Sequence, residues 1–329
     1  MRAMRLIAPR SSLTFQEVPI PEPLEHQVLI KVAACGVCRT DLHLLDGELP
    51  RISYPITPGH EIVGRVARCG EQVTMLHPGD RVGVPWLGYT CGSCFYCRRG
   101  AENLCECAGF TGYTLDGGYA EYVAADSRYC LKIPDQYTDI DAAPLLCAGL
   151  IGYRAYRAAG SARNLGLYGF GAAAHLLTQL ATQESRRVYA FVREGDLVGQ
   201  RFALSLGAAW AGASTEHAPE LLDAAIIFAP VGSLVPTALK ATRPGGRVVC
   251  AGIHMSEIPA FPYALLWGER SVCSVANLTR ADGADFMGIA SHTKLQPTVQ
   301  AFTLAQANVA LSKLRAGTLA GCAVLRVLD

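Results

Sequence analysis

Short apolar stretches between polar turns dominate the first half of the chain. Residues 26–35, 61–70 and 79–88 have the length of β-strands and are bounded by Gly, Pro, Asp or other polar residues. No helical periodicity extends over several turns before about residue 139. The pattern predicts a small β-barrel-like domain with long functional loops.

From about residue 140 the pattern changes to strands that alternate with helices. Residues 172–183 have the composition of a helix, and strand-like stretches recur at 165–170, 186–193, 221–230, 246–253 and 271–278. This alternation predicts a parallel sheet with helices on both faces. The tail, residues 290–329, ends in a further strand-like stretch, GCAVLRVL, that can return to the first domain.

Length and composition agree with two folded domains. The chain has 329 residues, more than one typical hydrophobic core holds. Hydrophobic residues make up 50% and charged residues 17%, and this composition excludes a disordered chain. The formal net charge is +1 and no long basic or acidic run is present, which argues against a nucleic-acid partner.

Targeting signals are absent from the pattern. No run of about 18 apolar residues predicts a transmembrane helix, and MRAMRLIAPR lacks the apolar segment of a signal peptide. We therefore expect a cytoplasmic protein without a membrane partner. In a reducing compartment, clustered members of the 13 cysteines are expected to bind metal rather than to form disulfides.

One cysteine cluster has the spacing of a zinc site. The stretch CGSCFYCRRGAENLC places four cysteines as C-x2-C-x2-C-x7-C: Cys91, Cys94, Cys97 and Cys105. A structural zinc ion takes four thiolates in a closed tetrahedron, and Gly92 and Gly100 permit the tight turns. Cys107 breaks the spacing and is expected to be a spare thiol. Four such cysteines also fit a nucleic-acid zinc ribbon, which the neutral charge disfavours.

A second motif predicts dinucleotide binding. YGFGAAAHL places Gly169-x-Gly171-x-x-Ala174 directly after a strand and at the start of a helix that begins near Ala172. The glycines let the backbone approach a pyrophosphate, and the helix N-terminus offers free N–H groups. The alternative is an incidental glycine-rich turn.

The end of the next strand bears on the choice of cofactor. An acid that binds the ribose of NAD is expected about 20 residues after the loop, where this chain has Val192, followed by Arg193. A neutral residue beside an arginine suits the 2′-phosphate of NADP(H), which we therefore favour. The alternatives are that Arg193 points into solvent, or that Glu194 binds the ribose.

The stretch AACGVCRTDLH, residues 33–43, combines a C-x-x-C pair with a polar cluster. Together with GHE at residues 59–61, PLLCAGL and the two motifs above, it resembles the zinc-dependent medium-chain alcohol dehydrogenases over essentially the whole chain. The resemblance implies a GroES-like catalytic domain, residues 1–148 and 290–329, with a structural zinc lobe at about 91–105. It also implies a Rossmann domain with a doubly wound parallel sheet, residues 149–289.

The same resemblance implies the ligands of a catalytic zinc ion, so that two zinc ions are expected per subunit. The implied ligands are Cys38, His60 and Cys147, with Glu61 beside the metal as a transient ligand. Three protein ligands leave one position open for the substrate oxygen. Cys35 falls outside the ligand position and is expected to be a packed thiol.

Further roles follow from the family motifs. Thr40 and His43 match a proton relay that passes through the cofactor ribose, and Asp41 matches the carboxylate that orients the ligand histidine. The alternative for His43 is a solvated loop histidine. Trp86 matches an aromatic residue that narrows the substrate pocket, although it could simply pack in the core. The expected cofactor contacts are Arg39, Ile253 and Arg280.

One position departs from the family pattern. The C-terminal strand of the family often carries an arginine near the pyrophosphate, whereas this chain has Cys322. One cofactor contact is therefore expected to be missing. The resemblance also implies a homodimer or homotetramer that assembles through the dinucleotide-binding domains.

The expected function is hydride transfer between a primary or simple secondary alcohol, or its aldehyde or ketone, and NAD(P)(H). A zinc-independent quinone or enone reductase of the same architecture is one alternative, and a non-catalytic zinc-binding interaction protein is another. Relatives of the first kind lack both zinc sites, and the complete set of Cys38, His60 and Cys147 speaks against both alternatives.

Overall fold

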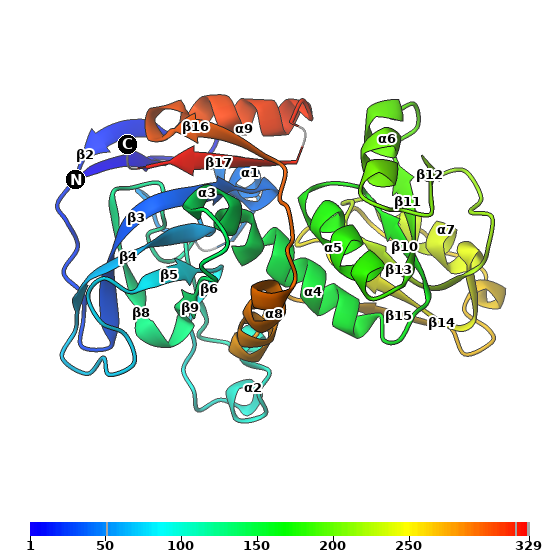
Figure 1. Cartoon of the computed structure of the whole chain (residues 1–329), viewed down its shortest axis with the longest axis horizontal. Coiled ribbons are helices and arrows are strands. Elements are labelled where there is room, and N and C mark those ends of the chain that lie inside the picture. Colours follow the sequence, from blue (N-terminus) through cyan, green and yellow to red (C-terminus); the bar gives the residue numbers. More distant parts are fainter. Residues whose placement is uncertain (51, 320, 328–329) are drawn as a thin grey trace. The chain divides into compact units, whose positions relative to one another are not determined.

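The computed structural model describes residues 1–50, 52–319 and 321–327. The chain divides into two compact units. Unit 1 comprises Met1–Cys147 and Leu278–Asp329, and unit 2 comprises Ala148–Asn277. Figure 1 shows how the C-terminal strands of the chain lie beside its N-terminal strands within unit 1.

Unit 1 is built on a seven-stranded sheet. Strand β3 pairs through its first half with β8 and through its second half with β17, and it pairs with β4 along its length. Its alternate residues Val28, Ile30 and Val32 are fully buried, as the apolar pattern predicts. The main strands are β3 (Gln27–Val37), β4 (Ile62–Cys69), β5 (Arg81–Val84), β8 (Tyr122–Asp126), β9 (Leu131–Lys132), β16 (Val299–Thr303) and β17 (Cys322–Arg326).

Small elements complete this unit. Two two-stranded sheets stand apart from the main sheet. They are β1 (Arg2–Arg5) with β2 (Thr14–Glu17), and β6 (Leu87–Tyr89) with β7 (Gly109–Phe110). The helices of the unit are α1 (Arg39–Leu45), α2 (Phe95–Arg98), α3 (Asp139–Ala142), α8 (Arg280–His292) and α9 (Ala307–Ala316).

Unit 2 is a doubly wound parallel sheet of six strands. The strand order is β12-β11-β10-β13-β14-β15, and every neighbouring pair is parallel. The order reverses between β10 and β13, which is where such sheets bind their ligands. The strands are β10 (Asn164–Tyr168), β11 (Arg187–Val192), β12 (Trp210–Ala213), β13 (Leu222–Ile227), β14 (Thr242–Cys250) and β15 (Ser271–Ser274).

Helices cover both faces of this sheet. Tyr168 of β10 and Phe191 of β11 are buried on the face that packs against Val235 and Leu239 of α7 (Leu234–Ala241). The intervening residues, such as Leu167, are also fully buried, so the strands are apolar on both faces. The remaining helices are α4 (Ala148–Ala158), α5 (Ala172–Gln183) and α6 (Leu197–Ser205).

The observed division differs from the predicted one at its second boundary. The sequence placed that boundary at residue 290, whereas the compact units divide at Leu278. Helix α8 belongs to unit 1 because it packs against β9. The last strand, β17, pairs with β3, so the tail does return to the first unit.

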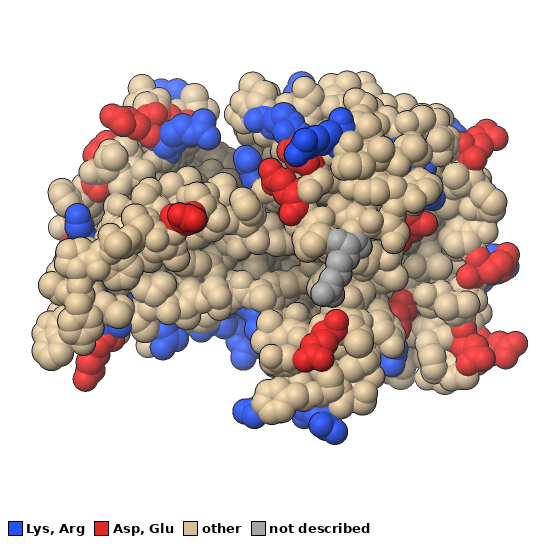
Figure 2. Space-filling view, turned by 180° about the vertical axis from the view of Figure 1, so that it is seen from behind, with Lys and Arg blue, Asp and Glu red and all other residues tan. Residues whose placement is uncertain are grey.

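Two observations bear on nucleic-acid and membrane partners. On the face shown in Figure 2, positive and negative side chains are interspersed rather than gathered into one extended patch of a single sign. Among the described residues, no helix is long and apolar enough to cross a membrane.

Candidate metal centres and dinucleotide loop

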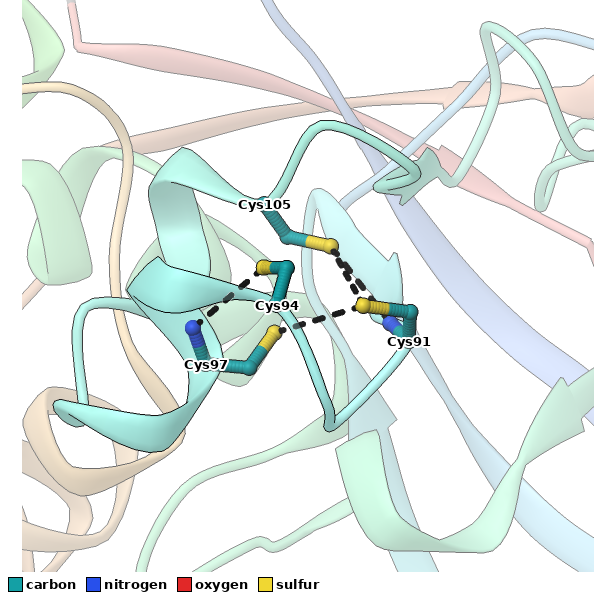
Figure 3. Close-up of side chains that lie close together, drawn as sticks. All are labelled: Cys91, Cys94, Cys97 and Cys105. Atoms are coloured by element: carbon teal, nitrogen blue, oxygen red, sulfur yellow. Dashed lines mark hydrogen bonds between the residues drawn. The ribbon is translucent and has the colours of Figure 1, made fainter.

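The four cysteines of the predicted structural zinc lobe lie together in unit 1 (Figure 3). The Cys91 sulfur lies 3.6 Å from that of Cys105 and 4.0 Å from that of Cys97. A tetrahedral zinc ion with bonds of about 2.3 Å separates its sulfur ligands by about 3.8 Å. The four-cysteine cluster therefore has the dimensions of a zinc site. Hydrogen bonds from backbone N–H groups also lower the pKa of the Cys91 thiol to about 6.

The tight turns predicted around the four-cysteine cluster are present. Gly92 and Gly100 have φ angles of +71° and +70°, which glycine adopts without strain. Cys107 is exposed and does not belong to the cluster. The lobe is held to α8 by Glu102, whose carboxylate accepts hydrogen bonds from the backbone and side chain of Arg280.

A second cluster joins residues from three distant parts of the sequence. The ligand atoms of Cys38, His60, Glu61 and Cys147 all lie within 4.8 Å of one another. Cys38 precedes α1 at the end of β3, His60 and Glu61 precede β4, and Cys147 follows Leu146 at the end of unit 1. The fold thus brings together the three predicted zinc ligands and the predicted transient ligand.

The geometry of this cluster fits a metal ion. The sulfurs of Cys38 and Cys147 are 3.7 Å apart, close to the separation of two thiolates on one zinc ion. His60 is 1% exposed, and its Nε2 atom has no hydrogen-bond partner among the described residues. A buried polar group without a partner is uncommon, and a metal ion would satisfy this one.

Electrostatics in the second cluster favour an anionic Cys38. A hydrogen bond from the Cys147 thiol lowers the pKa of Cys38 well below its usual range, and His60 lowers it further. The same bond raises the pKa of Cys147, as does burial. Burial, and next the negative charge of Cys38, raises the pKa of the Glu61 carboxyl well above its usual range.

Asp41 lies beside the ligand histidine. Its Oδ1 atom is 3.5 Å from His60 Nδ1, an ion-pair distance, and both side chains are 1% exposed. Its Oδ2 atom accepts hydrogen bonds from the backbone N–H of Cys38 at 2.8 Å and from the hydroxyl of Tyr119 at 3.0 Å. Sequence reasoning missed Tyr119, because nothing local marks a contact across 78 positions of the sequence.

The predicted relay residues lie on α1. The Thr40 hydroxyl oxygen is 3.7 Å from the sulfur of Cys38, and Thr40 is buried. The ring Nδ1 of His43 makes a short hydrogen bond with the carboxylate of Glu48, and the His43 side chain is 13% exposed. Arg39 begins the helix and belongs to unit 1.

An aromatic cluster adjoins His60. The Trp86 ring meets the His60 ring edge-on at 4.9 Å and is stacked with Phe110 at 5.2 Å and Tyr113 at 5.6 Å. Trp86 is 8% exposed and therefore packs in the core. Its contact with His60 shows that it also faces the second cluster. Phe110 and Tyr113 carried no signal in the sequence.

The predicted dinucleotide loop connects β10 to α5 in unit 2. Gly169 has a φ of +91°, and a Cβ atom there would lie 2.8 Å from the backbone nitrogen of Ala229. Gly171 caps the N-terminus of α5, which begins at Ala172, and the space beside it is open. Ala174 is fully buried against the sheet. This is the strand–turn–helix arrangement that binds a pyrophosphate.

The end of β11 carries the residues that bear on cofactor choice. Val192 is the last residue of the strand and is buried. Arg193 and Glu194 follow it and are exposed, and neither side chain has an ion-pair partner among the described residues. Both alternatives raised by the sequence therefore stay open at this strand end.

The remaining predicted residues lie in varied surroundings. Ile253 follows β14 and is 55% exposed. Cys35 is fully buried and outside both clusters. Cys322 is buried at the start of β17, and burial raises the pKa of its thiol, with smaller effects from Glu61 and Cys38.

Arg280 lies in unit 1 with its guanidinium over the ring of Tyr129. The contact of Arg280 with the cofactor stays a prediction.

Comparisons with known proteins agree with this geometry. Residues 24–135 match the family model of the alcohol dehydrogenase GroES-like domain. The chain is 43% identical to the protein named "Probable alcohol dehydrogenase AdhA" of Mycobacterium tuberculosis, over 94% of this chain and 91% of the relative.

Solved structures show the same fold. Acetophenone reductase from Geotrichum candidum, in complex with NAD, has a TM-score of 0.89 and 27% identity over 99% of this chain and 97% of its own. A zinc-binding dehydrogenase from Sinorhizobium meliloti, described as bound to NADP, has a TM-score of 0.88 and 25% identity over 99% of both chains. The chain therefore belongs to the medium-chain, zinc-type, NAD(P)-dependent alcohol dehydrogenase family.

Proposed function

We propose that this enzyme interconverts a primary or simple secondary alcohol and its aldehyde or ketone at a zinc ion held by Cys38, His60 and Cys147. The observation that carries the proposal is the second cluster, where two thiols 3.7 Å apart meet a buried histidine whose Nε2 atom has no hydrogen-bond partner among the described residues. The four-cysteine cluster would hold a second, structural zinc ion.

Zinc and the nicotinamide cofactor would supply the central chemistry of this reaction. Zinc with an open position is a Lewis acid that lowers the pKa of a bound alcohol, and the nicotinamide accepts the hydride. The protein binds and orients them. The carboxylate of Glu61 lies beside the three ligands, where it would serve as the transient metal ligand that the family resemblance implies.

Proton removal is assigned to α1. The Thr40 hydroxyl oxygen lies 3.7 Å from the Cys38 sulfur, so it would be placed to accept the proton of the substrate hydroxyl at Oγ1. His43 would deliver the proton to solvent, and the family resemblance implies that the ribose of a bound cofactor would connect the two side chains. The contact with Glu48 orients the His43 ring.

The substrate is expected to be small or slender. Trp86 stands edge-on to His60 and packs against both Phe110 and Tyr113, whose rings also contact each other, so it presents a bulky side chain beside the metal ligand. We expect this side chain to disfavour a branched carbon next to the carbinol.

We favour NADP(H) as the cofactor. Relatives are known with NAD and with NADP, so the family does not decide. The support comes from the end of β11, where Arg193 is exposed without an ion-pair partner among the described residues and can pair with a 2′-phosphate. With NADP(H), reduction of an aldehyde is the expected physiological direction.

A screen of zinc-loaded enzyme tests the proposal. Primary and simple secondary alcohols, and the matching aldehydes, are offered with NAD(H) and with NADP(H), and absorbance at the nicotinamide band is followed. We expect turnover of short linear alcohols that disappears in Cys38→Ser. Turnover that survives in Cys38→Ser, or activity confined to quinones and enones, would contradict the proposal.

A further inference from the structure

The segment Gly117–Tyr119 runs beside the loop that carries His60. Backbone N–H groups of Gly117, Gly118 and Tyr119 donate to the carbonyls of Thr57, Gly59 and Pro58, at 2.7, 2.9 and 3.0 Å. These three hydrogen bonds fix the backbone directly before the ligand histidine. The proposed chemistry uses none of these residues.

Glycines allow the two segments to approach this closely. A Cβ atom on Gly117 would lie 2.2 Å from the Gly59 carbonyl oxygen. Gly59 has a φ of +98°, and a Cβ atom there would lie 2.4 Å from the ring of Tyr119. The Tyr119 ring therefore occupies the space that a side chain before His60 would need.

The Tyr119 hydroxyl reaches the carboxylate beside His60. Tyr119 is fully buried, and its hydroxyl donates to Asp41 Oδ2 at 3.0 Å, where the Cys38 N–H also donates. Two donors on one oxygen fix the rotation of the carboxylate and leave Oδ1 facing His60 Nδ1. His60 Nε2 is then the nitrogen left for a metal ion.

We propose that Tyr119 is a positioning residue for the catalytic zinc site, and that its hydroxyl acts through Asp41 to hold His60 in its ligating orientation. The inference rests on the proposed role of His60 as a zinc ligand. Partners of metal-bound histidines typically change metal affinity by about 10- to 100-fold when removed. Because Tyr119 acts one residue further away, we expect the lower end of this range.

Zinc release from the zinc-loaded enzyme to a chromophoric chelator tests this proposal in Tyr119→Phe, which keeps the ring and removes the hydroxyl. The catalytic phase is identified as the one missing in Cys38→Ser. We expect that phase to be about tenfold faster in Tyr119→Phe, with the structural phase unchanged. Tyr137→Phe is the control, because Tyr137 is a buried tyrosine whose hydroxyl donates to Thr293 O, away from both clusters.

A second comparison shows whether Tyr119 acts through Asp41. Asp41→Asn should also accelerate the catalytic phase, and the double variant should release zinc no faster than Asp41→Asn alone. An unchanged rate in Tyr119→Phe, equal acceleration of both phases, or additive effects in the double variant would overturn the inference. If the wild-type enzyme shows no phase that depends on Cys38, the proposed function itself fails.

Discussion

Asp41 serves the fold and the metal site with one carboxylate. As the third residue of α1 it accepts the N–H of Cys38 at the start of the helix, and its other oxygen faces His60. The carboxylate that caps the start of α1 therefore also contacts His60, a candidate zinc ligand. The proposed ligand Cys38, the proposed relay residues Thr40 and His43, and Asp41 therefore lie within a few positions of one another in the sequence.

The local part of the site was predictable from the sequence for this reason. The spacing from Cys38 to His43 is a property of one strand end and one helix turn. Tyr119, Phe110 and Tyr113 were not predictable, because they reach the site through tertiary packing and have no distinctive spacing. The carboxylate of Glu61 packs against Gly36, where a Cβ atom would lie 1.8 Å from a carboxylate oxygen. This contact could not be predicted from the sequence either.

The relay makes a prediction for His43. His43→Gln removes the group that passes the proton to solvent, so alcohol oxidation should slow by about 10- to 100-fold near neutral pH. Because a base in solution can replace the missing group, small amine or imidazole buffers should restore part of the rate. The measurement is the pH profile of kcat with and without added base. A profile like that of the wild-type enzyme would remove His43 from the mechanism.

At the scale of single elements, the proposed preference for NADP(H) depends on the residues at the end of β11. Arg193→Ala should lower kcat/KM for NADP+ by about tenfold or more, because a charge-assisted hydrogen bond contributes roughly 1.5–3 kcal/mol. The value for NAD+ should change little. Steady-state kinetics with both cofactors checks this, with Glu194→Ala as the neighbouring control. A wild-type preference for NAD+, or a loss of kcat/KM for NAD+ in Glu194→Ala, would favour the ribose-binding alternative.

The zinc lobe makes a second prediction at this scale. Cys97→Ser should remove the structural zinc ion and lower the melting temperature by several degrees, because metal binding stabilises the folded lobe. Cys107→Ser should change neither, since Cys107 is exposed and outside the cluster. Metal analysis with thermal unfolding makes the comparison. Equal zinc content in the two variants would contradict the assignment.

The apolar pattern predicted the strands β3, β4, β10, β11, β13, β14 and β15 and helix α5, whereas most of the short elements were not predicted. The stretch 79–88 forms two strands, β5 and β6, because Pro85 between them cannot donate a ladder hydrogen bond. The four-residue β12 (Trp210–Ala213) was missed, because it is short and contains a glycine and two alanines, so it shows no strand-like apolar pattern. The boundary at Leu278 was missed because the packing of α8 against β9 depends on the tertiary fold.

At the scale of the whole molecule, we expect a homodimer or homotetramer that assembles through unit 2. Strand β15 is the edge of the parallel sheet, and Tyr263 and Trp267 before it are 68% and 67% exposed. Trp267→Glu should therefore weaken assembly. Light scattering after gel filtration measures the mass, with 35.1 kDa as the single subunit. A wild-type enzyme that is monomeric at micromolar concentration would contradict this expectation.

The zinc content of the purified enzyme tests the central claim most directly. Mass spectrometry of the metal should give two zinc ions per subunit for the wild-type enzyme and for Cys35→Ser, whose buried thiol lies outside both clusters. Cys38→Ser should retain only the structural ion. One zinc ion per subunit in the wild-type enzyme, or two in Cys38→Ser, would contradict a catalytic zinc site at Cys38, His60 and Cys147.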